Sequence, residues 1–314
     1  MDRPGALAAI GNTPLVELQH LSPDHGARIL VKLEYLNPTG AIKDRLALAM
    51  IEGAEGDRRI GPGTVIVEYT GGSTGPGLAL VGAVKGYRVK IVTSSCFSEQ
   101  PRQLMRALGA DVEVLPALVG PGIVTPGDID GMVKRAGEYA ELPNHHFTDQ
   151  FRSPYIIPGL REGLGREILD RLGGSVTAYC AGVGSGATLL GPAEVLRQAN
   201  PAIRIVALEP AGSPVLSGGA RGPFKIQGWS GFVPPLYRPE LVDAIETITD
   251  EQAMSTTLRL ARDEGIFTGV SGGANVAGAV RIAASLGPDD IVVTVVPDSG
   301  YKYLAAEPYL QATT

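Results

Sequence analysis

Short β-branched runs alternate with longer helical patterns along most of the chain. The runs predict strands at residues 65–69, 89–92, 110–114, 177–180, 204–208 and 291–296. Between these runs the pattern predicts helices at residues 41–51, 78–85, 101–108 and 189–198. This alternation predicts an α/β fold with mainly parallel, twisted sheets and helices on both faces. In such sheets ligands bind at the carboxyl ends of the strands, where the glycine-rich turns of this chain fall.

The length of the chain predicts two domains. At 314 residues it exceeds what one compact core usually serves, and we place the division near residues 150–158. Residues 120–130, rich in glycine and proline, are expected to form a loop. His145 and His146 are adjacent, but no second cluster of histidine, cysteine or aspartate has metal-ligand spacing. We expect both histidines in a loop.

Composition and charge exclude several classes of protein. A net charge of -6 without a basic stripe argues against nucleic-acid binding. Two cysteines, Cys96 and Cys180, provide no disulfide framework and fit a reducing compartment; we expect Cys180 in the core. The first residues do not resemble a signal peptide, and no run approaches the roughly 18–20 apolar residues of a membrane helix. We therefore expect a soluble, cytoplasmic protein without a membrane partner.

A glycine-rich turn at residues 182–188 follows one expected strand and opens a helix. Its backbone N–H groups and the helix N-terminus suit a phosphate without any basic side chain. The residues expected to take part are Gly182, Gly184, Ser185, Gly186, Ala187 and Thr188.

The same turn also fits a dinucleotide. Gly182, Gly184 and Ala187 satisfy the G-x-G-x-x-A pattern. Glu209 follows the next expected strand, where an acid would bind a ribose. This alternative, an NAD-dependent oxidoreductase, gives no role to Lys43, and we rank it second.

A second turn, T-G-G-S-T-G at residues 70–75, presents N–H and hydroxyl donors at a helix N-terminus. Such donors suit the carboxylate of an amino-acid substrate. A serine or threonine helix cap gives the same pattern, so this turn alone does not establish a substrate.

Lys43 lies in the expected first turn of the helix at residues 41–51, after the helix-breaking Pro38 and Gly40. The positive end of the helix dipole disfavours the ammonium form, and a neutral lysine is a nucleophile. Taken alone, the position favours an ordinary solvated lysine. Together with a phosphate-binding turn, it fits the lysine that carries pyridoxal phosphate as a Schiff base.

Ser299 follows the expected strand at residues 291–296. A hydroxyl there can bond a pyridine nitrogen while leaving it unprotonated, which makes the ring a weak electron sink. A weak sink favours elimination and replacement at Cβ over transamination, for which a carboxylate partner is expected. Asp298 is adjacent, so the choice between the two side chains stays open.

Several further segments occur together in a fixed order, at residues 10–16 (I-G-N-T-P-L-V), 32–45, 150–151, 225–228 and 265–274. With the two turns and Lys43, they resemble the cysteine synthase (O-acetylserine sulfhydrylase) and cystathionine β-synthase family of fold type II pyridoxal phosphate enzymes. The resemblance covers nearly the whole chain.

The resemblance implies β-replacement on an activated L-serine, such as O-acetyl-L-serine, with sulfide or another nucleophile, giving L-cysteine or a β-substituted alanine. It implies that Lys43 forms the Schiff base and moves the α-proton, and that the turn at residues 182–188 holds the phosphate. It assigns a cofactor contact to Ser73 and the pyridine nitrogen to Ser299. It assigns substrate contacts to Thr70, Gly71, Gly72, Thr74, Gln150 and Gly228.

The resemblance also implies a tryptophan synthase β-like organisation. Residues 35–150 would form a smaller, mobile substrate-binding domain. Residues 1–34 and 151–314 would form a larger domain that binds the cofactor phosphate. The implied partners are an amino-acid substrate, a nucleophile and a second copy of the chain in a homodimer. No metal is expected.

The chain departs from the family pattern at the substrate turn. The family's usual T-S-G-N-T-G is T-G-G-S-T-G, so Gly71 replaces a serine and Ser73 an asparagine. The stretch from Gly228 is one residue shorter and contains the only tryptophan, Trp229. We expect the core chemistry to survive and the choice of substrate to differ. The alternatives within this fold are a serine or threonine dehydratase, a non-protein amino acid synthase and a non-catalytic, cofactor-binding partner.

Overall fold

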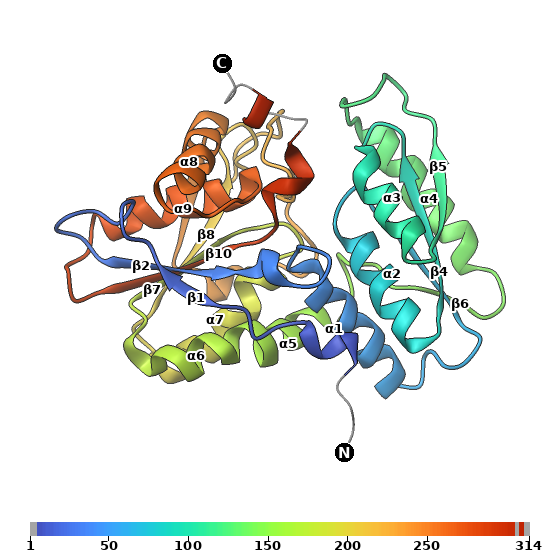
Figure 1. Cartoon of the computed structure of the whole chain (residues 1–314), viewed down its shortest axis with the longest axis horizontal. Helices are drawn as coiled ribbons and strands as arrows, with labels where there is room; N and C mark the ends of the chain where they lie inside the picture. Colours follow the sequence, from blue (N-terminus) through green and yellow to red (C-terminus); the bar gives the residue numbers. More distant parts are fainter. Residues whose placement is uncertain (1–4, 305–307, 311–314) are drawn as a thin grey trace. The chain divides into compact units, whose positions relative to one another are not determined.

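The structure, a computed structural model, describes residues 5–304 and 308–310 (Figure 1). The chain forms two compact units. Unit 1 contains the described part of Met1–Ile10 together with Lys43–Ile156, and unit 2 contains Gly11–Ile42 and the described part of Ile157–Thr314. Strands and helices alternate and both sheets are mainly parallel, so the predicted α/β fold is confirmed. The functional division into a mobile and a phosphate-binding domain stays a prediction.

The sheet of unit 1 is parallel, with the spatial order β5 (Asp111–Leu115), β4 (Arg88–Ser94), β3 (Val65–Tyr69) and β6 (His145–Phe147). The α-helices described in this unit before the junction are α1 (Lys43–Gly56), α2 (Thr74–Lys85), α3 (Glu99–Ala107) and α4 (Pro126–Ala140). The helices α2 and α3 lead outward from β3 to β5, and α4 returns from β5 to β6. Right-handed crossovers therefore place α4 on the opposite face from α2 and α3.

Two predicted loops in unit 1 are wrong in part. Residues 126–130 belong to α4, because Thr125 and Asp128 form a capping box in which each side chain bonds the other's N–H group, at 3.3 and 2.9 Å. This local cap outweighs the glycine and proline content. His145 and His146 lie in β6, where they pair with β3 through Val65 and Ile66.

The sheet of unit 2 has the order β1 (Leu15–Glu17), β2 (Arg28–Leu33), β10 (Ile291–Val296), β7 (Ala178–Gly182), β8 (Arg204–Pro210) and β9 (Ala244–Ile248). The strand β1 pairs antiparallel with β2, and the other pairs are parallel. The longer helices are α5 (Ile156–Leu160), which begins at the junction of the units, α6 (Arg166–Leu172), α7 (Ala187–Ala199), α8 (Asp250–Asp263) and α9 (Val270–Ala283). Figure 1 shows α6 and α7 on one face of this sheet and α8 and α9 on the other.

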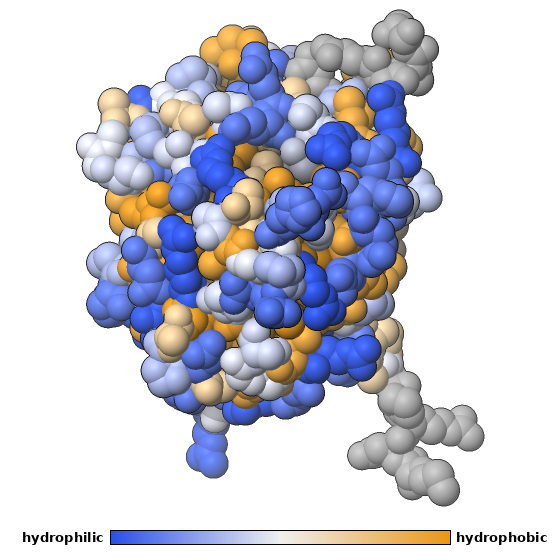
Figure 2. Space-filling view, turned by 90° about the vertical axis from the view of Figure 1, so that its left-hand side faces the viewer, coloured by the Kyte–Doolittle hydropathy of each residue, from blue (hydrophilic) through white to orange (hydrophobic). Residues whose placement is uncertain are grey.

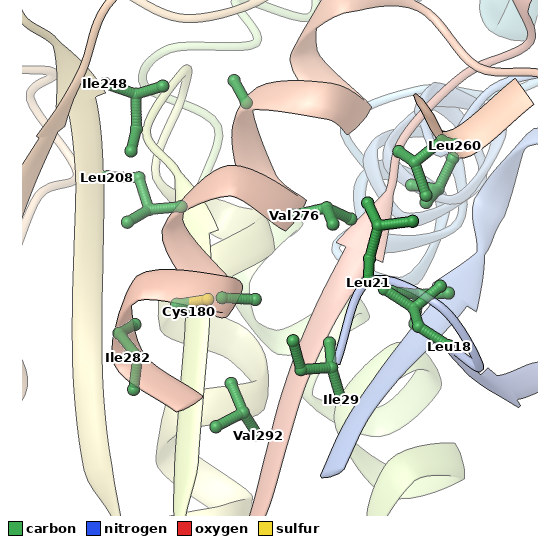
Figure 3. Close-up of a cluster of buried hydrophobic side chains, with 14 of the residues drawn as sticks. Leu18, Leu21, Ile29, Cys180, Leu208, Ile248, Leu260, Val276, Ile282 and Val292 are labelled. Atoms are coloured by element: carbon green, nitrogen blue, oxygen red, sulfur yellow. The ribbon is translucent and has the colours of Figure 1, made fainter. Parts of the chain in front are cut away.

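The core of unit 2 fills the space between the sheet and α9 (Figure 3). Ile29, Val292 and Cys180 project from three neighbouring strands, and Val276 and Ile282 from α9; all five are at most 2% exposed. The prediction that Cys180 is a core residue is confirmed. Complete burial of a branched aliphatic side chain stabilises a fold by about 1.5–3 kcal/mol, so this core holds the strand ends firmly.

In each sheet, the chain adds two strands on one side of a first strand and then returns to place the next strand on its other side. The first strand and the returning strand are therefore a pair of neighbours. The pair is β3 and β6 in unit 1, and β7 and β10 in unit 2. Open α/β sheets bind ligands at the carboxyl ends of such a pair. The turns singled out in the sequence follow these four strands.

Hydrophilic and hydrophobic residues are interspersed over the face of the molecule seen in Figure 2. Among the residues that the structure describes, no helix has the length and apolar character needed to cross a membrane.

Candidate active site

The loop after β7 is shaped by glycines. An ideal Cβ at Gly184 would lie 2.4 Å from the carbonyl oxygen of Gly228, so no side chain fits there. Gly186, directly before α7, has a φ of +95°, a left-handed conformation that glycine adopts without strain. These two glycines allow a bound ligand to approach the backbone of the loop closely.

The N–H groups of this loop form a cradle for an anion. Within residues 5–304 and 308–310, no acceptor bonds the N–H groups of residues 184–188. They lie at the N-terminus of α7, whose dipole adds positive potential. Ser185, which is 5% exposed, adds a hydroxyl to the same loop. Such a row of unsatisfied donors fits the phosphate of pyridoxal phosphate.

Trp229 covers the beginning of the loop. An ideal Cβ at Gly182 would lie 1.8 Å from Nε1 of Trp229. The N–H group and the hydroxyl of Ser230 both donate to the carbonyl oxygen of Val183, at 2.9 and 3.1 Å. Gly228, the predicted substrate contact, thus belongs to a segment that packs directly on the loop after β7.

Ser299 lies beyond the carboxyl end of β10, the neighbour of β7. Its N–H group donates to the carbonyl oxygen of Gly40 at 3.1 Å, and its Oγ accepts from the N–H group of Tyr301 at 3.2 Å. The carboxylate of Asp298 accepts from the hydroxyl of Tyr303 at 2.5 Å. Because Oδ2 of Asp298 accepts from Tyr303, and the hydroxyl proton of Ser299 has no acceptor among the described residues, Ser299 is the better candidate for a pyridine nitrogen.

Asn275, which the sequence reasoning missed, ties these two strand ends together. Its Oδ1 accepts from the N–H group of Gly182 at 2.8 Å, and its Nδ2 donates to the carbonyl oxygen of Val295 at 2.9 Å. The side chain is 1% exposed. A polar residue inside an otherwise small and apolar helical stretch was the available signal.

Lys43 is the first residue of α1, in the predicted first helical turn. The chain just before it is held by the strand end that carries Ser299: the N–H group of Ile42 donates to the carbonyl oxygen of Pro297 at 2.8 Å, and Ala41 forms a β-bridge with Asp298. The position of Lys43 along the chain is therefore anchored one residue away.

The second turn brings several predicted substrate residues together in unit 1. The hydroxyl of Thr74 donates to Oε1 of Gln150 at 2.7 Å, across 76 positions of sequence. The Oγ1 of Thr70 accepts from the N–H group of Gly72 at 3.0 Å, which shapes the turn. Ser73 is the residue directly before α2, which begins at Thr74. Thr70, Thr74 and Gln150 are all buried, so polar groups converge at the ends of β3 and β6.

Gly71 leaves room for an aromatic ring. An ideal Cβ there would lie 2.2 Å from Cε1 of Phe97, so the aromatic ring occupies the space of a side chain at position 71. An ideal Cβ at Gly72 meets nothing within 4 Å. The ring of Phe97 therefore lies beside Gly71, and there is open space beside Gly72. The sequence alone identified the glycine at position 71 but not its contact with Phe97.

Glu209 does not support the dinucleotide alternative. It lies within β8, not after it, and it is 1% exposed. Its carboxylate accepts from the N–H groups of Leu216 and Ser217, at 2.6 and 3.0 Å, and from the hydroxyl of Ser217. An acid engaged in this way is not presented to a ribose.

The predicted residues thus form two groups, one in each unit. Unit 2 gathers the loop at residues 182–188 with Gly228 and Ser299, and unit 1 gathers the turn at residues 70–75 with Gln150, while Lys43 opens α1.

Comparisons with known proteins agree with this geometry. The sequence matches the family described as Pyridoxal-phosphate dependent enzyme over residues 6–298. A cysteine synthase of Staphylococcus aureus (strain N315) is 42% identical over 305 residues, which cover 96% of this chain and 95% of that protein.

Two solved structures have the same fold. O-ureido-L-serine synthase has a TM-score of 0.88 and 36% identity, covering 97% of this chain and 94% of its own. The O-acetylserine dependent cystathionine beta-synthase of Helicobacter pylori has a TM-score of 0.90 and 36% identity, covering 98% and 99%. The resemblance inferred from the sequence motifs is confirmed.

Proposed function

Because the chain belongs to the pyridoxal-phosphate dependent enzyme family, we propose that it replaces the leaving group at Cβ of O-acetyl-L-serine with sulfide. The Cβ–O bond breaks, a Cβ–S bond forms, and L-cysteine and acetate are released. The observation that carries the proposal is the row of unbonded N–H groups at residues 184–188, which follow β7, the neighbour of the strand β10 that precedes Ser299. The name of the relative in Staphylococcus aureus supports the reaction.

When bound, pyridoxal 5'-phosphate supplies the electron sink that stabilises negative charge at the substrate's Cα. Residues 184–188 would hold its phosphate, Lys43 would hold it covalently and Ser73 would lie near its ring hydroxyl. Ser299 would meet the pyridine nitrogen. A neutral hydroxyl there keeps the nitrogen unprotonated, which favours replacement at Cβ over transamination.

Two groups would act on the substrate itself. Thr70, Thr74 and Gln150 would bind its carboxylate, Thr74 through its backbone N–H group, because its hydroxyl donates to Oε1 of Gln150. One proton of Nε2 of Gln150 points to the carbonyl oxygen of Tyr69 at 3.5 Å, which leaves the other for the carboxylate. The amine of Lys43 would then remove the proton at Cα, as a positioned general base.

The identity of the nucleophile is the finer question. The names of the two structural relatives indicate products with nitrogen–oxygen and thioether groups at Cβ, so hydroxyurea and L-homocysteine are the natural competitors of sulfide. We infer that the protein is cytoplasmic and, from the family resemblance, that it forms a homodimer. Light scattering during gel filtration tests the homodimer, for which we expect a mass twice that of the chain.

The test is turnover by the purified, cofactor-loaded protein. O-acetyl-L-serine is mixed with sulfide, L-homocysteine or hydroxyurea, and O-phospho-L-serine serves as a second donor. We expect L-cysteine and acetate in equal amounts with sulfide. Pyruvate and ammonia without a β-substituted product would instead establish elimination, and no reaction with either donor would contradict the proposal.

A further inference from the structure

Glu68 is a fully buried carboxyl group for which the proposed reaction has no role. It lies near the end of β3, two residues before Thr70, and its exposed fraction is 0%. Among the described residues, no basic side chain forms an ion pair with it. A buried acid without a basic partner needs another reason to be there.

The carboxyl group of Glu68 joins the ends of two neighbouring strands. Its Oε2 accepts from the N–H group of Gln150 at 3.1 Å and lies 2.7 Å from Oγ1 of Thr148. Its Oε1 accepts from the N–H group of Tyr69 at 3.0 Å. One side chain on β3 therefore holds the segment that follows β6 and carries Gln150.

That segment is strained and needs support. Asp149, between Thr148 and Gln150, has a φ of +41°, in the left-handed region that non-glycine residues rarely adopt. The bonds from Glu68 lie on both sides of this residue. They keep Gln150 where its Oε1 meets the hydroxyl of Thr74.

We propose that Glu68 is the positioning residue that holds Gln150 in the orientation that binds the substrate carboxylate. The inference rests on the proposed function, since it takes Gln150 to be part of the carboxylate site. Glu68 itself touches no substrate group and acts through Gln150.

The network fits the protonated form of Glu68. Burial raises the pKa of this carboxyl to about 8, and the nearby charge of Asp149 acts in the same direction, while the bonds from Thr148, Tyr69 and Gln150 oppose it. The hydroxyl of Thr148 also lies 3.2 Å from the carbonyl oxygen of Val67. A protonated Glu68 donates to Thr148, which then donates to Val67, so every group is satisfied.

In ionised Glu68 the hydroxyl of Thr148 donates to the carboxylate, which also accepts from the N–H groups of Gln150 and Tyr69, while burial and the charge of Asp149 oppose this form. Arg152 also lies near this network, where its charge acts on Tyr69. Because the N–H group of Gln150 donates to Glu68 in either form, we expect Gln150 to stay in place as the pH rises through 8. The KM for the carboxylate-bearing substrate should therefore depend on the presence of this acceptor, with a smaller effect on kcat.

The test compares Glu68→Ala with Glu68→Gln in the cofactor-loaded protein. Glu68→Ala should raise the KM for O-acetyl-L-serine at least tenfold at pH 7, with kcat within threefold of the wild type. Glu68→Gln should keep KM within threefold, because its amide oxygen still accepts from the N–H group of Gln150.

A matched control removes a different buried carboxyl group of unit 1. Asp128 is 4% exposed and bonds Thr125 and Leu118, far along the chain from Gln150. Asp128→Asn should lower thermal stability and leave KM unchanged. An increase of KM in Asp128→Asn equal to that in Glu68→Ala would overturn the inference, since it would reflect general loosening.

Two readouts decide the inference independently of turnover. Amide hydrogen exchange at residues 148–151 should accelerate at least tenfold in Glu68→Ala and not in Glu68→Gln. The dissociation constant of L-serine, followed by the absorbance of the bound cofactor, should change as KM does. Unchanged exchange and affinity in a folded Glu68→Ala protein would refute the role of Glu68. Failure of the wild type to use O-acetyl-L-serine would refute only the proposed reaction.

Discussion

In the turn at residues 70–75, a side chain at position 71 would overlap the ring of Phe97, since an ideal Cβ there would lie 2.2 Å from the ring. We predict that Gly71→Ser lowers the free energy of unfolding by about 1–3 kcal/mol, as overpacking commonly does. Adding Phe97→Ala should make the double variant more stable than the sum of the single effects. Urea denaturation of the four proteins measures this coupling, and strictly additive losses would show that the ring does not fill that space.

At the scale of single residues, the sequence revealed the groups that follow a strand or open a helix. The positions of Lys43 at the start of a helix and of Ser299 after a strand were predictable, because both follow from the local pattern. The contacts of Phe97, Asn275 and Glu68 were not predictable, because they join residues that lie far apart along the chain. The separations are 26, 93 and 82 residues, respectively. Such contacts depend on which strands become neighbours.

At the scale of elements, Asn275 links the ends of β7 and β10. Asn275→Ala leaves the N–H group of Gly182 and the carbonyl oxygen of Val295 without their partner, at a cost of about 1–3 kcal/mol for each group. Because those strand ends carry the phosphate loop and Ser299, we predict at least tenfold weaker binding of pyridoxal phosphate. Reconstitution of the apoprotein, followed by absorbance, measures this affinity.

Asn200 provides the control for that variant. Its Nδ2 donates to the carbonyl oxygen of Val176 at 3.0 Å, just before β7 begins. Asn200→Ala should therefore destabilise the protein without weakening cofactor binding. Equal losses of affinity in Asn200→Ala and Asn275→Ala would show that the link between the strand ends has no special part.

The elements themselves were largely predictable. The strand at residues 291–296 was predicted with its observed bounds, since a continuous β-branched run has few alternatives. The start of α4 was missed, because the cap formed by Thr125 and Asp128 outweighs nearby glycines and prolines. The helix at Thr74 begins earlier than predicted, within the glycine-rich turn.

At the scale of the whole molecule, both sheets use the same arrangement: the predicted site turns follow a first strand and the strand that the chain later places on its other side. The α/β class followed from the alternation of strands and helices. The strand order did not, because an alternating pattern does not specify which strands are neighbours. The predicted site residues gather into two groups, one in each unit, because the strand order makes β3 the neighbour of β6 and β7 the neighbour of β10.

The buried acid Glu68 makes the stability of the folded chain depend on pH. Its pKa of about 8 in the folded protein exceeds the ordinary value of 4.5, so the folded state binds more protons between these values. Its stabilising contribution is complete below pH 4.5 and is lost as the pH rises through 8. We predict that the free energy of unfolding falls less between pH 6 and 9 in Glu68→Gln than in the wild type. Identical pH profiles from urea titrations would contradict this assignment.

The most direct measurement concerns Lys43 and the coenzyme. Native protein is reduced with borohydride, digested and analysed by mass spectrometry, with Lys43→Ala treated in parallel. We expect a yellow protein whose coenzyme is fixed to the peptide that contains Lys43, and no fixed coenzyme in Lys43→Ala. Attachment to another lysine, or extraction of an adenine nucleotide in place of pyridoxal phosphate, would contradict it.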